Sequence, residues 1–100
     1  MEERLDAALD RILKRAWPKL LERLDLLRTA LAHLEAGTLG PELRHAAHTV
    51  AHQLTGTLGI FGWREAGHCA RRIEAGLDRE DPDLADMKLA LAELSAHLER

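Results

Sequence analysis

The chain has 100 residues, of which 46% are hydrophobic, 31% are charged and 3% are aromatic, and its formal net charge is −3. This length suits a single domain over residues 1–100, and the near-neutral charge argues against nucleic acid or an anionic membrane as a partner. A charged N-terminus without an apolar segment predicts no signal peptide, and no apolar run is long enough for a spanning helix. We therefore expect a cytoplasmic protein.

The N-terminal third predicts two helices. Residues 2–16 carry apolar side chains at the spacing of one helix face, namely Leu5, Ala8, Leu9, Ile12 and Ala16. Pro18 is expected to end or kink this helix at Trp17, because proline removes a backbone donor and clashes with the preceding turn. The second helix, residues 18–35, carries leucines at heptad-like spacing, namely Leu20, Leu24, Leu27, Leu31 and Leu34. The glycines of residues 37–40 end it.

A third helix is expected to begin at Pro41 and to end at Gly62. One face predicts a core seam, formed by Leu43, Ala47, Val50, Leu54, Thr57 and Phe61. The opposite face carries His45, His48, His52, Thr55, Gly56 and Gly59. A glycine inside a helix costs about 1 kcal/mol relative to alanine, and Gly62 already serves as the terminating glycine. We interpret Gly56 and Gly59 as a smooth surface that lets another protein approach His52.

The segment Ala51–Gly56 resembles the signature of the histidine phosphotransfer (HPt) domain family, whose core reads His-x-x-Lys-Gly. The likeness is strongest to the phosphotransfer domain of chemotaxis-type histidine kinases. There the phosphorylated histidine is followed by glycine at +4, Phe-Gly at +9 and +10, and glutamate at +22. Those positions hold Gly56, Phe61–Gly62 and Glu74 here. The family's lysine at +3 is replaced by Thr55.

The resemblance implies that His52 carries a phosphoryl group to or from the aspartate of a response-regulator receiver domain, with Glu74 orienting its imidazole. The supporting residues would be His48, Gln53, Thr55, Gly56, Gly59 and Arg71. The receiver is expected to supply Mg²⁺, so we expect no cofactor or metal on this chain, and a histidine kinase is the second expected partner. Residues 37–42 lack the Gly-Lys-[Ser/Thr] of a P-loop, which predicts a carrier rather than an ATP-using enzyme.

The C-terminal third predicts two more helices. Trp63 opens a fourth helix with one apolar face, formed by Ala66, Ala70, Ile73 and Leu77. Arg71 and Arg72 lie on this helix and would offset the missing lysine if the fold brings them close to His52. After a charged loop, Asp81 reads as the N-cap of the last helix, with Pro82 at its first position. The seam of that helix is Leu84, Met87, Leu91, Leu94 and Leu98.

These elements predict an all-α domain. Short connections imply antiparallel neighbours, so we expect an antiparallel up-down four-helix bundle over about residues 18–98 with an additional N-terminal helix over about 2–16. The heptad-like spacing also fits a coiled-coil dimer. Glycine and proline breaks every 15 to 20 residues argue against that alternative, because coiled coils sustain several uninterrupted heptads. A monomer is therefore expected.

Two other functions stay open on the residues alone. His48 and His52 have i, i+4 spacing and His45 lies one turn earlier, so two or three imidazoles could meet a zinc ion, although no acidic ligand completes the set at helical spacing. A purely structural interaction module would explain the bundle, but it leaves the two helical glycines without a purpose. Cys69 is the sole cysteine, which excludes an intramolecular disulfide and predicts a small buried thiol.

Overall fold

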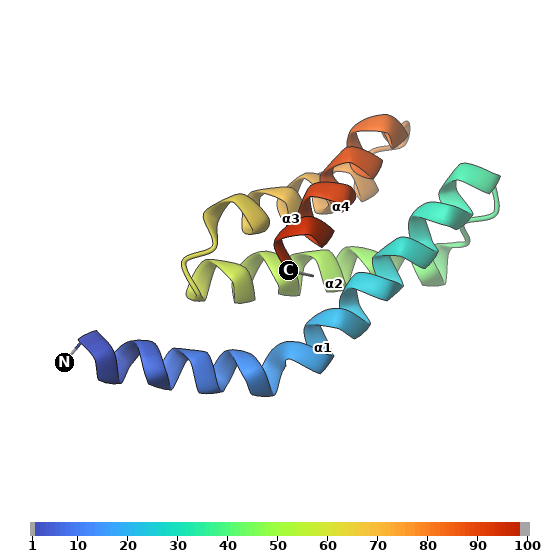
Figure 1. Cartoon of the computed structure of the whole chain (residues 1–100). Coiled ribbons are helices and arrows are strands. Elements are labelled where there is room, and N and C mark those ends of the chain that lie inside the picture. The colour runs from blue at the N-terminus through green and yellow to red at the C-terminus, as the bar shows by residue number, and fades with distance from the viewer. Residues whose placement is uncertain (1, 99–100) are drawn as a thin grey trace.

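The computed structural model describes the backbone of residues 2–98 and the side chains of residues 7, 8 and 10–98. Over these residues the chain forms four helices and no strand, namely α1 (Glu2–Ala36), α2 (Pro41–Ile60), α3 (Arg64–Leu77) and α4 (Leu84–Leu98). The last helix, α4, packs against α1 (Figure 1). The predicted all-α class is confirmed for this part of the chain. None of the described helices has the length and apolar character needed to cross a membrane.

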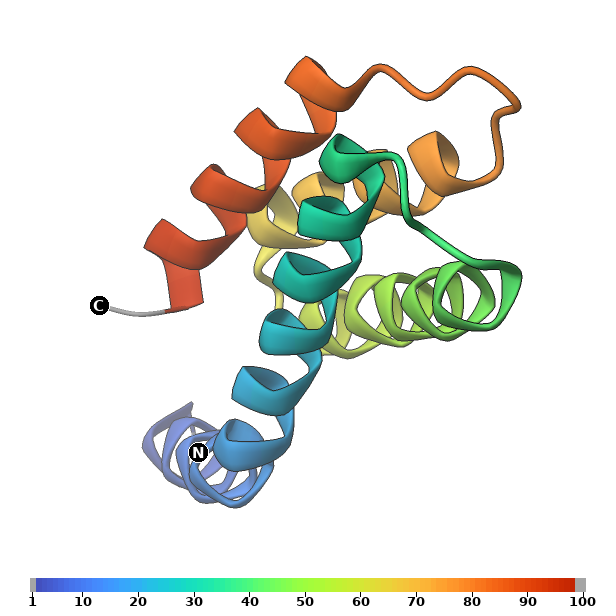
Figure 2. The same cartoon turned by 90° about the vertical axis from the view of Figure 1, so that its right-hand side faces the viewer.

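The helix α1 passes through Pro18 without interruption. The predicted separate N-terminal helix is therefore wrong, because its residues form the first half of α1. Figure 2 shows that α1 bends sharply near Pro18, which is the kink that a proline inside a helix produces by removing the hydrogen bond to the carbonyl of Lys14. The helix continues because side chains pack on both sides of the bend. Trp17 contacts Trp63 edge-on, with ring centroids 6.4 Å apart, and Leu20 is buried.

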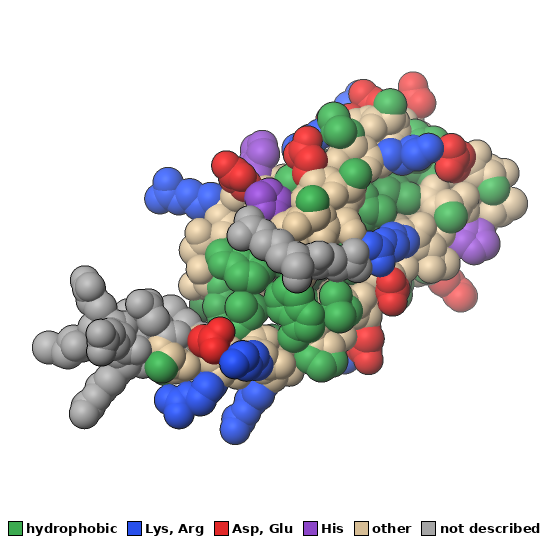
Figure 3. Space-filling view, in the orientation of Figure 1, with side chains coloured by type: hydrophobic (Ala, Val, Ile, Leu, Met, Phe, Trp, Pro, Cys, Tyr) green, Lys and Arg blue, Asp and Glu red, His purple; other side chains and the backbone are tan. Residues whose placement is uncertain are grey.

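The first half of α1 projects from the core. Ile12 is 54% exposed, and Leu5 and Leu9 of the predicted stripe have side chains outside the described residues. A hollow lined partly by Leu13, Trp17 and Trp63 opens beside the bend. Figure 3 shows hydrophobic side chains gathered on this side of the molecule.

Glycines in the left-handed region end α1 and α2, as predicted. Gly37 and Gly62 both have φ +74°, a conformation that costs little only for glycine. At the end of α2 the amide of Trp63 donates to the carbonyl of Leu58 (3.0 Å), and the amide of Gly62 donates to Gly59 (3.1 Å). This pair of bonds is a Schellman motif, which turns the chain directly into α3.

The helix starts are predicted less well. Pro41 stands in the first turn of α2, as expected. The last helix, however, begins at Leu84, and the carboxylate of Asp83 accepts a hydrogen bond from the amide of Asp86 (3.1 Å). The N-cap is therefore Asp83 and not Asp81, because the aspartate nearest the first free amides satisfies them.

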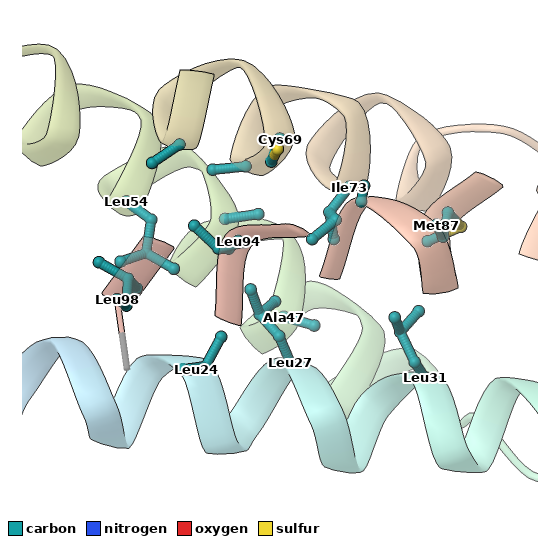
Figure 4. Packing of buried hydrophobic residues seen from close by; sticks show 14 of the residues in the cluster. Leu24, Leu27, Leu31, Ala47, Leu54, Cys69, Ile73, Met87, Leu94 and Leu98 are labelled. Atoms are coloured by element: carbon teal, nitrogen blue, oxygen red, sulfur yellow. The ribbon is translucent and has the colours of Figure 1, made fainter. Parts of the chain in front are cut away.

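The core lies between the four helices. Figure 4 shows leucines of α1 pointing toward residues of α2, α3 and α4. The largest fully buried side chains are Leu20, Leu24, Leu27, Leu54, Leu58, Ile73, Met87, Leu94 and Leu98. Each leucine moved from water to such a site contributes about 1.5–3 kcal/mol, so burial of these side chains holds the four helices together.

The buried face of α2 is rotated from the predicted seam. Its buried residues are Ala47, Ala51, Leu54 and Leu58, whereas the predicted members Thr57 and Phe61 are half-buried. The rotation follows from α3, which approaches α2 closely where Gly67 lies beside Leu58. This rotation leaves the histidine side of α2 facing partly along α3.

Candidate functional site

The central contact of the site joins α2 to α3. Nδ1 of His52 lies 2.8 Å from Oε2 of Glu74. The imidazole is 74% exposed, whereas the Glu74 side chain is 20% exposed and therefore held against the helices. The contact that the resemblance implied between these two residues is present.

The chemistry of the pair fixes the imidazole. A carboxylate only accepts hydrogen bonds, so Nδ1 of His52 carries the proton and donates it to Glu74. In a neutral imidazole the other nitrogen, Nε2, is then the unprotonated one. The result is a nucleophilic nitrogen on an exposed ring whose orientation and tautomer are both set by a neighbouring helix.

Two further residues of α2 contact the end of α3. Nε2 of His48 lies 3.0 Å from Oδ1 of Asp78, with a geometry that falls short of a hydrogen bond. Nε of Arg44 donates to the carbonyl of Leu77 (2.9 Å), and the same guanidinium donates to the carbonyl of Arg79 (2.8 Å).

Arg44 and Asp78 were not among the residues predicted from the sequence. Their spacing could have identified them. Arg44 and His48 precede His52 at steps of four residues, and Asp78 follows Glu74 by four. Residues at these steps share a helix face. The face of α2 that carries His48 and His52 therefore contacts α3 and the residue after it in matching pairs, His52 with Glu74 and His48 with Asp78.

The glycines beside His52 have no packing role inside the described chain. A Cβ atom added at Gly56 or Gly59 would have no heavy atom within 4 Å beyond the local helix backbone. Gln53 and His45 are exposed on the same helix, and Ile60 is 79% exposed at its end. The surface beside His52 is thus open, without side chains at Gly56 and Gly59, and partly apolar.

Thr55 and Arg71 line one shallow hollow beside this surface, together with Gly59, Trp63, Arg64, Gly67 and His68. The hydroxyl of Thr55 donates to the carbonyl of Ala51 (2.9 Å). Arg72, by contrast, pairs with Asp86 and Glu93 of α4. Of the two arginines predicted to offset the missing lysine, the structure places Arg71 on the Thr55 side and turns Arg72 toward α4.

The zinc alternative gains no support from the geometry. His48 and His52 each contact a different carboxylate. Among the residues that the structure describes, no three His, Cys, Asp or Glu side chains gather in a way that could hold a metal ion.

The chain is similar to a curated protein over most of its length. Protein RcaC of Microchaete diplosiphon is 35% identical to this chain over 80 residues, an alignment that covers 77% of the chain and 12% of RcaC. The chain thus spans a small part of the length of that curated relative. No protein-family model matches the chain, and no solved structure matches it.

Proposed function

We propose that the chain is a histidine phosphotransfer domain of a two-component phosphorelay, with His52 as the residue that carries the phosphoryl group. The observation that carries the proposal is the 2.8 Å contact from Nδ1 of His52 to Glu74 on a ring that is 74% exposed. A histidine with a purely structural role would need neither an exposed ring nor a fixed tautomer. His52 has both, which favours a chemical role.

The proposed reaction uses Nε2 of His52 as the nucleophile. Its lone pair attacks the phosphorus of an aspartyl phosphate on a receiver domain, the N–P bond forms, and the acyl P–O bond breaks as the aspartate leaves as a carboxylate. The imidazole gains positive charge in this step. Glu74 accepts the Nδ1 proton in a hydrogen bond throughout and so stabilises that charge.

The partner would supply what this chain lacks. Magnesium and most of the charge neutralisation are assigned to the receiver domain, and a histidine kinase is the expected source of the phosphoryl group. The chain itself would be a carrier without an ATP site, and its four helices would form an antiparallel up-down bundle located in the cytoplasm. Gly56 and Gly59 would form the docking surface, because they leave open space beside His52.

The similarity to Protein RcaC adds independent support for a link to two-component signalling. The matched part of this chain is large, at 77%, although it corresponds to 12% of the relative.

Incubation with ³²P-labelled receiver domains tests the function. Transfer should give an acid-labile, base-stable label on this chain, the behaviour of a phosphoramidate, and His52→Gln should abolish it. The matched control is His45→Gln, because His45 is exposed on the same helix and should leave the label in place. Label that persists in His52→Gln would contradict the proposal.

A further inference from the structure

The register between α2 and α3 places Thr55 opposite Arg71. His52 contacts Glu74, and His48 contacts Asp78, so a step forward along α2 corresponds to an equal step back along α3. Three residues forward from His52 is Thr55, and three residues back from Glu74 is Arg71. Both line the same hollow, which confirms this correspondence.

The two helices come close enough here for one ligand to touch both. At Gly67 a Cβ atom would lie 3.8 Å from the carbonyl oxygen of Thr55 and 3.8 Å from Cβ of Leu58. With glycine at that position the floor of the hollow is backbone. His52 lies one turn before Thr55 along α2, so a group attached to its ring would stand beside this low surface.

Arg71 is an exposed cation of this hollow, and it lies nearer to Glu74 along α3 than Arg64, the other arginine that lines it. Its side chain is exposed, and it makes no hydrogen bond or ion pair with another described residue. The neighbouring Arg72 is already occupied by Asp86 and Glu93. Thr55 brings no charge, and its hydroxyl proton is committed to the carbonyl of Ala51.

A phosphoryl group on Nε2 of His52 would carry close to two negative charges on three acceptor oxygens. A guanidinium satisfies such a group well, because its donors form a planar fork that matches two oxygens at once. We propose that Arg71 binds the phosphoryl oxygens of phosphorylated His52, and that this arginine of α3 takes the part of the lysine that Thr55 replaces on α2. This inference rests on the proposed phosphotransfer function.

The test uses the full chain and potassium phosphoramidate, a small-molecule phosphoryl donor. After the donor is removed, mass spectrometry follows the loss of phosphate from His52. Arg71→Gln should shorten the half-life of phosphorylated His52 roughly two- to five-fold, the size expected for an exposed charge pair, and Arg71→Lys should recover part of the loss. Arg79→Gln changes the net charge equally, just after the C-terminal end of α3, and should leave the half-life unchanged.

A double variant makes the test sharper. Thr55→Lys in the Arg71→Gln background returns a cation from α2 and should restore the half-life, while circular dichroism checks that each variant is folded. If the natural chain takes label on His52 and Arg71→Gln behaves like it, the role of Arg71 is overturned and the phosphotransfer function stands. If the natural chain takes no label on His52, the function itself fails.

Discussion

Nε of Arg44 donates a hydrogen bond of 2.9 Å to the carbonyl oxygen of Leu77, about two turns of α2 away from His52. The guanidinium lies at the C-terminal end of α3, where free carbonyls and the helix dipole favour a positive charge. Since α3 also carries Glu74, the Arg44 contact helps to fix the position of α3 along α2, and so keeps that carboxylate beside His52. The site therefore depends on a helix pair and not on two side chains alone.

Replacing Arg44 by alanine should destabilise the protein by about 1–2 kcal/mol, because the carbonyls of Leu77, at the end of α3, and of Arg79, just after it, lose a charged donor. Urea denaturation followed by circular dichroism gives the change in the free energy of unfolding. Arg79→Ala is the control. It removes an exposed side chain but keeps the backbone carbonyl that Arg44 contacts, so its effect should stay within about 0.5 kcal/mol. Equal free energies of unfolding for the two variants would contradict a role of Arg44 in holding α3.

Replacing Glu74 by alanine should leave the fold intact, shift the tautomer balance of His52 and slow phosphoryl transfer without abolishing it. The reason is that the carboxylate orients and tunes the ring, whereas the nucleophile is Nε2 itself. Nitrogen-15 NMR of the imidazole reads the tautomer directly. Glu74→Gln keeps an acceptor oxygen but removes the charge, so it separates the hydrogen bond from the electrostatic effect. Identical tautomer populations in the natural chain and Glu74→Ala would show that Glu74 does not set the tautomer of His52.

Replacing Gly56 by alanine should stabilise the protein by about 0.5–1 kcal/mol and slow transfer from a receiver. Alanine has the higher helix propensity, and its methyl group meets open space inside the chain. The same methyl group would stand on the docking surface beside His52. Thermal unfolding and the transfer rate are measured on one sample, and a stabilised variant with an unchanged rate would mean that the partner does not touch Gly56.

Gly76 supplies the contrast, because it is buried against α4. A Cβ atom there would lie 2.7 Å from Sδ and 2.8 Å from Cγ of Met87. Gly76→Ala should therefore destabilise the protein by about 1–3 kcal/mol, the usual cost of overpacking. It lies away from the open face of α2, so the folded fraction should transfer at the natural rate.

The thiol of Cys69 predicts a pH dependence. Burial raises the pKa of Cys69, and its hydrogen bond to Glu93 raises the pKa further. Since the unfolded thiol ionises first, near its ordinary pKa of about 8.5, this group stabilises the fold fully below that pH and progressively less above it. The free energy of unfolding should fall between about pH 8 and pH 10, and Cys69→Ala should lack that part of the fall. An identical pH dependence in the two proteins would contradict the assignment.

The helix ends were predictable because their causes are local. Gly37 and Gly62 adopt the left-handed conformation that only glycine adopts easily, and Pro41 suits a first turn. Pro18 was ambiguous for the same local reason, since a proline favours either a break or a kink. The packing of Trp17 on Trp63 decides for the kink, and that contact joins residues far apart in the sequence.

The site was predictable in part. Helical periodicity placed His52 on the open side of α2, but the pairing with Glu74 came from the family resemblance, because periodicity cannot tell which helices face one another. The contacts of His48 with Asp78 and of Arg44 with the end of α3 depend on the rotation of α2 toward α3. That rotation depends on how closely α3 approaches α2 at Gly67, and the sequence pattern of either helix alone does not predict this approach.

The most direct test of the central claim is the position of the phosphoryl group after labelling, read from nitrogen-15 and phosphorus-31 NMR of the full chain. Because Nδ1 of His52 is held by Glu74, we expect one N–P coupling, at Nε2 of His52, which is absent in His52→Gln. A phosphoryl group on Nδ1 of His52, or on another of the six histidines, would contradict the account.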